Sequence, residues 1–303
     1  MARAGLLFVG TDDGAVLFSN PNNIGRWLRI GQPFRGQAVR ALWPLPDNPL
    51  VVFAAVAGQG LQRSDDGGQS WRTLFDVDIQ GVVGHDNAPN MLYTWAVGGE
   101  LYASADGGEH WDRRILQGSA AFAAARIAIA ADDARRLYVG HAHGIWTSSD
   151  AGVTWARFGE QAPQDVQALA AHPTRSGRLY AAAASGVYSC DGPQADWQGV
   201  AGAPPAEDAL AILAGQQPAL LLAEAGASIA RYDEASASWT TTALDGDWSG
   251  AITVITPVGY HIDMAFAGSA SGQLATSTDR GRTWQLIKQD LPPIRAVVAA
   301  RLV

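Results

Sequence analysis

Three short apolar stretches of the sequence carry an arginine near their start. Arg40 lies in VRALW (39–43), Arg295 lies in the similar stretch IRAVV (294–298), and Arg126 precedes a third stretch. A guanidinium group is planar and permanently charged, so it binds carboxylate or phosphate through two parallel hydrogen bonds. Three converging arginines would form an anion site. The alternative is that each arginine pairs with a nearby loop carboxylate.

His141 and His143 give the sequence its most metal-like pattern. Two histidines two residues apart lie on one side of a strand or straddle a loop. A metal site needs at least a third ligand, and Glu100, in the equivalent loop of the neighbouring repeat, is the only candidate that position suggests. Structural histidines are the more common explanation, so the metal site is a secondary hypothesis.

The elements that position these residues follow a repeat marked by seven tryptophans. They lie about 40–45 residues apart, a period typical of a four-stranded propeller blade. The interval from the last tryptophan through the end of the chain and on from Met1 to the first is similar, so the repeats close into a ring. We predict an all-β, seven-bladed β-propeller with four-stranded antiparallel blades, formed as a single domain by residues 1–303. The tryptophans are Trp27, Trp71, Trp111, Trp155, Trp197, Trp239 and Trp284.

The first repeat lacks its first strand, because the segment before Leu6 is too short. The stretch at 294–298 resembles the first strand of repeat two, so we expect the C-terminal strand to complete the N-terminal blade. Closure of this kind removes the unpaired sheet edges that favour aggregation. A large ring recurs in the second strand of most repeats, which places Tyr93, Tyr138 and Tyr180 in the core rather than in a catalytic site.

The composition narrows the range of functions. The chain has 48% hydrophobic residues, 17% charged residues and a formal net charge of −8. An acidic chain lacks the basic surface that nonspecific binding to nucleic acid or anionic membranes requires. Its one cysteine excludes an intrachain disulfide. No apolar run is long enough for a signal peptide or a membrane helix, so we expect a cytoplasmic protein without a membrane, nucleic-acid or cofactor partner.

Four of the repeats share the motif Ser-x-Asp-x-Gly-x-x-Trp. It occurs at Ser64/Asp66/Gly68/Trp71, Ser104/Asp106/Gly108/Trp111, Ser148/Asp150/Gly152/Trp155 and Ser277/Asp279/Gly281/Trp284. The pattern resembles the Asp-box (bacterial neuraminidase repeat) propellers of the sialidase-like superfamily. That superfamily includes glycosidases, sortilin-type receptors and the photosystem II stability/assembly factor-like proteins. The short repeats are most similar to the assembly-factor type, which implies a non-enzymatic protein whose Asp-boxes lie on the outer rim.

The resemblance also implies where a ligand would bind, at the channel mouth opposite the Asp-box turns. One repeat position at the start of the innermost strand faces this mouth in our alignment. We expect its polar members to bind a ligand, joined by Trp95 and Trp248, which lie outside the tryptophan repeat. Around the ring the aligned position is occupied by Arg295, Arg40, Gln80, Arg126, Gln167, Ala209 and Ala251.

Two functions fit this arrangement. The first is a non-catalytic scaffold that binds a protein partner or a small anionic or sugar ligand at the channel mouth. The second is a glycoside hydrolase or lyase that uses loop carboxylates such as Asp76 with Asp78, or Asp245 with Asp247. Catalytic propellers usually carry long insertions around a cleft, whereas we expect connections of at most about 6–8 residues here. This favours the scaffold.

Overall fold

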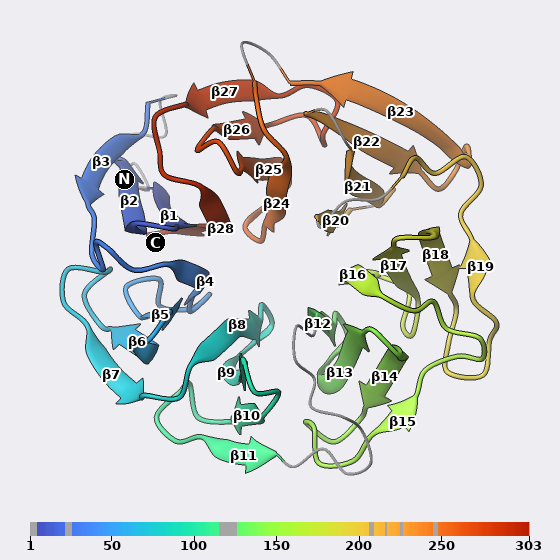
Figure 1. Ribbon diagram of the computed structural model, residues 1–303, viewed down its shortest axis with the longest axis horizontal. Helices are drawn as coiled ribbons and strands as arrows, with labels where there is room; N and C mark the ends of the chain where they lie inside the picture. The colour runs from blue at the N-terminus through green and yellow to red at the C-terminus, as the bar shows by residue number, and fades with distance from the viewer. Residues whose placement is uncertain are drawn as a thin grey trace.

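The described chain folds into seven antiparallel sheets of four strands each. The computed structural model describes residues 5–21, 26–114, 126–205, 209–215, 217–224, 227–244 and 248–302. Figure 1 shows the sheets arranged as blades around a central axis, in chain order from blue to red. The predicted all-β, seven-bladed propeller is therefore confirmed. Within the ranges just given, no helix has the length and apolar character needed to cross a membrane.

The strands fall into four concentric layers. The innermost strands are β28 (Ile294–Arg301), β4 (Val39–Pro44), β8 (Ile79–His85), β12 (Arg126–Ala130), β16 (Val166–Ala171), β20 (Leu210–Leu213) and β24 (Ile252–Val258). The second layer contains β1 (Gly5–Thr11), β5 (Val52–Val56), β9 (Ala88–Ala96), β13 (Asp133–His141), β17 (Leu179–Ala183), β21 (Ala219–Glu224) and β25 (His261–Ser269).

The two outer layers complete each blade. The third strands are β2 (Gly14–Asn20), β6 (Gly60–Ser64), β10 (Leu101–Ser104), β14 (Gly144–Ser148), β18 (Gly186–Cys190), β22 (Ser228–Asp233) and β26 (Leu274–Ser277). The outermost are β3 (Leu28–Gly31), β7 (Arg72–Phe75), β11 (Asp112–Arg114), β15 (Ala156–Arg157), β19 (Gln198–Gly199), β23 (Ser238–Ala243) and β27 (Gln285–Lys288). Blades 1 to 7 are numbered from the one that contains β1.

The ring closes through β28, which pairs antiparallel with β1 from Gly5 opposite Arg301 to Thr11 opposite Ile294. Blade 1 thus has the strand order β28-β1-β2-β3 and joins the two ends of the described chain. The predicted C-terminal closing strand is confirmed. Because β1 has partners on both sides, no innermost edge is left open in this blade.

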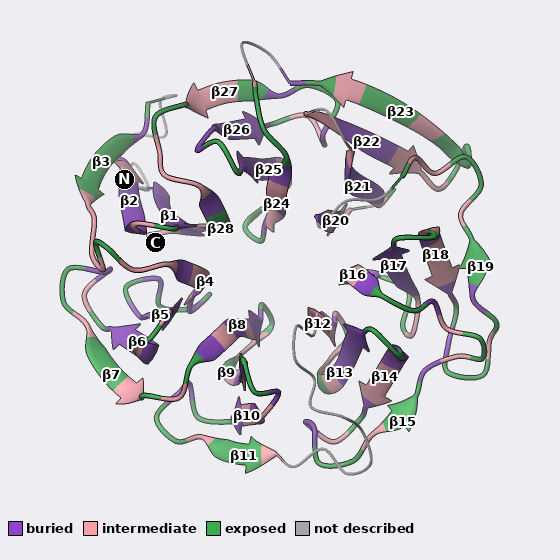
Figure 2. Cartoon of the chain, viewed as in Figure 1, coloured by how far each residue is buried: buried purple, intermediate pink, exposed green. Residues whose placement is uncertain are grey.

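The core lies between neighbouring blades rather than inside one blade. One cluster, for example, packs Phe53 and Leu61 of blade 2 against Ile79 and Leu92 of blade 3. Figure 2 shows buried residues concentrated in the middle strands and exposed residues on outer strands such as β7 and β11. Each blade therefore buries its faces only against its two neighbours, as expected for a repeat architecture.

The three repeat tyrosines belong to this core, as predicted. Tyr93, Tyr138 and Tyr180 are at most 1% exposed. The Tyr93 hydroxyl donates a hydrogen bond to the Ala134 carbonyl oxygen of the next blade at 2.8 Å. Burial raises the pKa of Tyr93 to about 12, so its hydroxyl stays protonated. These side chains serve packing between blades.

The Ser-x-Asp-x-Gly-x-x-Trp turns are closed by their own side chains. In the turn of repeat two, the Ser64 hydroxyl accepts the Gly68 N–H at 2.8 Å and donates to Asp66 at 2.8 Å. The Asp66 carboxylate also accepts the Ser70 hydroxyl and N–H, which lowers the pKa of Asp66 to about 2. The Trp71 Nε1–H donates to the Gly68 carbonyl oxygen at 3.0 Å. All these groups are thus used within the turn.

Each of these turns also packs on the preceding blade through its glycine. A Cβ atom added to Gly108 would lie 2.4 Å from Cζ of Phe53, and the φ of Gly108 is +84°. A side chain is therefore excluded both by space and by backbone conformation. Gly152 and Gly281 contact leucines of the preceding blades in the same way.

The connections differ from the expected length in one described place. The segment between β19 and β20 spans residues 200–209 and is longer than predicted. The reason is that β19 ends at Gly199, only two residues after Trp197, whereas β23 and β27 run further beyond their tryptophans. Loop length therefore discriminates less clearly between scaffold and enzyme than the sequence indicated.

We expect Ser148→Ala to lower the free energy of unfolding by about 1–3 kcal/mol, because the substitution leaves the buried Gly152 N–H without its acceptor. Urea denaturation at neutral pH measures this change. Ser149→Ala is the matched control, since repeat three carries Ala105 at the equivalent position. Equal stability of the two variants would show that the turn does not depend on the serine hydroxyl.

Candidate functional site

The starts of the inner strands surround a cavity of about 870 Å³ at one mouth of the channel. The structure brings together six of the seven predicted ligand residues on its walls, Trp248 being the exception. Gln80 and Gln167 lie among the three arginines, and the cavity draws residues from blades that are far apart in sequence (Figure 1). Its lining consists of Asp12, Ala38, Arg40, Ala41, Gln80, Gly81, Trp95, Arg126, Gln167, Ala251, Ile252, Thr253 and Arg295.

A β-bulge presents most of these side chains to the channel. In blade 2, Val39 pairs with Val56 and Ala41 with Ala55, so Arg40 is an extra residue without a partner of its own. The same register shift leaves Gln80, Gln167, Thr253 and Arg295 as the extra residues of their strands. A bulge bends the strand and changes the direction of a side chain. The bulge is the local feature that turns this repeat position toward the channel.

The register corrects two positions of the predicted alignment. Arg126 pairs with Gly140, and Gly140 pairs with Ile145, as Ala41 pairs with Ala55 and Ala55 with Leu61. Arg126 is therefore level with Ala41, one residue beyond the level of Arg40. In blade 7 the equivalent of Arg40 is Thr253 and not Ala251. Both errors arise because a bulge changes the residue count along a strand, which an ungapped repeat alignment cannot detect.

Several of these side chains link one inner strand to the next. The Arg40 Nη1 donates to the Ile79 carbonyl oxygen of blade 3 at 2.9 Å. The Arg126 Nε donates to the Gln167 carbonyl oxygen of blade 5 at 2.6 Å, and the Thr253 hydroxyl donates to the Ile294 carbonyl oxygen at 2.6 Å. The channel-facing residues therefore have a structural role between blades.

Two of the arginines also pair with carboxylates at the cavity. Arg295 binds Asp12 through two hydrogen bonds, Nε to Oδ1 at 2.7 Å and Nη2 to Oδ2 at 2.8 Å. The Arg40 Nη1 lies 2.7 Å from Oδ1 of Asp78. Hydrogen bonding to these arginines holds the pKa of Asp12 and that of Asp78 below the usual range. Local pairing, the alternative to an anion site, is thus observed for Arg40 and Arg295.

The pairs are nevertheless open to solvent. The side chains of Arg295 and Asp12 are 49% and 37% exposed, and those of Arg40 and Asp78 are 26% and 46% exposed. Such exposed pairs contribute about 0–1 kcal/mol to stability. A carboxylate or phosphate from outside can therefore compete for the guanidinium groups at small cost to the fold.

The two tryptophans outside the repeat lie in different places. Trp95 lines the cavity and packs over Gly81, where an added Cβ would lie 2.2 Å from the indole ring. Trp248 instead packs against the hydrophobic cluster between blades 6 and 7 and is absent from the cavity lining. The prediction grouped them because both interrupt the tryptophan period, but sequence position does not reveal which side of a blade each ring covers.

His141 and His143 lie at the end of β13 and in the turn that follows. Nδ1 of His141 accepts the His143 N–H at 3.2 Å, and burial lowers the pKa of His141. Within the described ranges no group of three potential metal ligands occurs. Glu100, the suggested third ligand, accepts a hydrogen bond from Arg113 at 3.2 Å. The pair thus remains a candidate without a described third ligand.

Of the carboxylate pairs considered for catalysis, Asp78 is engaged by Arg40, and Asp245 and Asp247 lie outside the described residues. The sequence analysis missed two contributors to the cavity, Thr253 and Asp12. Asp12 precedes the glycine that begins β2, a turn position that could have identified it.

We expect Arg295→Gln to raise the pKa of Asp12 toward that of a free carboxyl group, measurable by NMR titration. Because the folded pKa of Asp12 lies below its unfolded value, the pair stabilises the fold above the unfolded pKa. That contribution, no more than about 1 kcal/mol, is lost as the pH falls through the folded pKa. Arg40→Gln should change Asp78 and leave Asp12 unaltered. An unchanged Asp12 titration in Arg295→Gln would contradict the assigned pair.

No protein-family model and no curated protein sequence matches the chain. Its fold is similar to that of an ancestral GH74 enzyme (TM-score 0.69, 15% identity, 93% of this chain and 46% of that one). It is also similar to a GH74 xyloglucanase from Xanthomonas campestris (TM-score 0.66, 17% identity, 83% and 45%). A third similar structure is YCF48 bound to D1 peptide (TM-score 0.60, 18% identity, 82% and 80%). The chain thus spans less than half of these GH74 structures and most of YCF48, and at such identities the similarity shows the propeller fold alone.

Proposed function

We propose that the chain is an Asp-box propeller of the photosystem II stability/assembly factor-like type. In this proposal it is a non-catalytic scaffold that binds an acidic segment of a partner protein at the channel cavity. The observation that carries the proposal is the convergence of Arg40, Arg126 and Arg295 on one cavity. Guanidinium groups held at fixed positions on a rigid ring suit the recognition of carboxylates.

The four closed turns support the Asp-box part of the proposal. Their aspartates are fully used in holding serine or threonine hydroxyls and backbone N–H groups, as Asp150 is by Ser148 and Thr154. These carboxylates are thus structural, and the ligand site lies elsewhere. A peptide rather than a small ion fits the size of the cavity, about 870 Å³, and its mixture of charged, amide and apolar walls. The peptide-bound structure of YCF48 is a precedent on the same fold.

We expect a random peptide library, panned on the immobilised protein, to yield acidic peptides. Counter-selection on Arg40→Gln/Arg126→Gln/Arg295→Gln removes peptides that bind elsewhere. Synthetic peptides from the wild-type pool should bind at least about tenfold more weakly to this variant by fluorescence anisotropy, because one buried charge-assisted contact is worth about 1.4 kcal/mol or more. Binding should also weaken with salt.

The control removes the same number of charges from the outer strands, where Arg29, Arg72 and Arg113 are exposed. Replacing these three by glutamine should leave peptide binding unchanged. Equal binding by both triple variants would refute the channel site. Thermal stabilisation of the wild type by citrate or phosphate, without any enriched peptide, would instead indicate a small-anion site.

The glycosidase alternative is supported by the two GH74 neighbours. A glycosidase needs one carboxyl group with a raised pKa as general acid, whereas the pKa values of Asp12 and Asp78 are both lowered. We therefore expect no new reducing ends when the protein is incubated with xyloglucan. Hydrolysis that persists in a second, independently purified preparation would favour the enzyme.

A further inference from the structure

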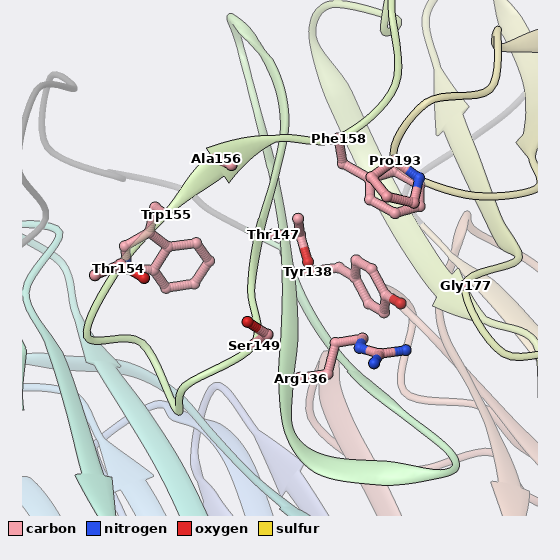
Figure 3. A pocket seen from close by; sticks show the side chains of 10 residues that line it. All are labelled: Arg136, Tyr138, Thr147, Ser149, Thr154, Trp155, Ala156, Phe158, Gly177 and Pro193. Carbon is pink, nitrogen blue, oxygen red and sulfur yellow. The ribbon is translucent and has the colours of Figure 1, made fainter.

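A second cavity, of about 440 Å³, lies at the outer rim between blades 4 and 5. Figure 3 shows Trp155 on one side and Phe158 with Pro193 on the other, with Thr147, Tyr138 and Arg136 between them. The site is separate from the channel, because none of these residues lines the channel cavity. Its volume falls in the range of small-molecule sites.

The cavity exists because repeat five lacks a complete turn motif. In the complete turns of repeats two to four, the tryptophan Nε1–H donates to the glycine of its own turn, as Trp155 does to Gly152 at 3.1 Å. Trp197 instead donates to the Phe158 carbonyl oxygen of blade 4 at 3.0 Å. Asp191, in the degenerate turn, binds Arg178 through one nitrogen at 2.6 and 2.8 Å. The turn therefore does not cover Tyr138 as Gly108 covers Phe53.

The polar groups of the cavity offer both acceptors and donors. The Thr147 hydroxyl already donates to the Leu137 carbonyl oxygen at 3.1 Å, and the Thr154 hydroxyl donates to Asp150 at 2.5 Å. Each hydroxyl therefore keeps only its oxygen lone pairs for a ligand. Arg136, which donates to the Ser176 hydroxyl at 3.1 Å, has further N–H groups to donate. A ligand group that both donates and accepts, such as an alcohol, matches this set.

The charge balance favours an uncharged ligand. Arg136 is the one charged residue that lines the cavity, and its Nη2 lies 3.9 Å from Oδ2 of Asp133. An anion would meet this carboxylate, and a cation would meet the guanidinium. The aromatic and proline walls in turn suit a flat apolar face.

We propose that this rim cavity binds a neutral sugar unit. The hydroxyls of the sugar accept from Arg136 and donate to the Thr147 and Thr154 oxygens, while its C–H face packs between Trp155 and Phe158. This site is independent of the proposed partner site in the channel.

The test is saturation-transfer NMR and calorimetric titration of the full chain with D-glucose, D-galactose, D-xylose and cellotetraose. Ala156→Gln fills the cavity, and repeats five and seven carry Gln198 and Gln285 at the same position, so the fold tolerates it. Arg136→Gln removes the donor. Arg135→Gln, an exposed neighbour on the same strand, is the matched control. Binding of at least one sugar should fall at least tenfold in the first two variants and stay unchanged in the control.

Binding of none of the four sugars, or binding that all three variants retain, would overturn the proposal. Binding of cellotetraose alone would identify a unit of a glycan chain as the ligand, and binding of monosaccharides would identify free sugars. Arg40→Gln/Arg126→Gln/Arg295→Gln should bind sugar as the wild type does. The channel and rim sites can thus fail separately.

Discussion

The structure depends on the packing of each blade against its two neighbours. A single four-stranded sheet has two apolar faces and cannot bury either alone, so every hydrophobic cluster is shared between adjacent blades. The ring must also close, since an open arc would leave two such faces in water. Closure by β28 on β1 supplies the last interface and ties the fold to the integrity of the final strand.

Each interface is fixed at two ends by different chemistry. At the rim, a hydrogen-bonded turn places a glycine against the preceding blade, and no side chain fits between them. At the channel, side chains on bulged or neighbouring positions reach the backbone of the next inner strand, as Arg40 reaches Ile79. The candidate binding residues are therefore also structural. Their guanidinium groups are held in place before any ligand arrives, which reduces the entropy lost on binding.

Departures from the repeat are where both candidate sites lie. The inner bulges replace a regular ladder position with arginine, glutamine or threonine, which would have no apolar role in the channel. The degenerate turn of repeat five leaves a hollow that a complete turn would fill. Regular repeats provide rigidity, and local exceptions provide surfaces of distinct chemistry. Fold alone does not assign a function to either surface.

The sequence by itself determined the fold, because the tryptophan period, the buried ring position and the missing first strand are all local patterns. It predicted Tyr93 in the core and β28 as the closing strand for the same reason. The tertiary structure alone decided that Arg126 lies one residue off the register of Arg40, that Arg295 holds Asp12, and that Trp248 turns away from the channel. These features depend on bulges and on contacts between distant blades, and a shift of one residue moves a side chain to the other face of a sheet.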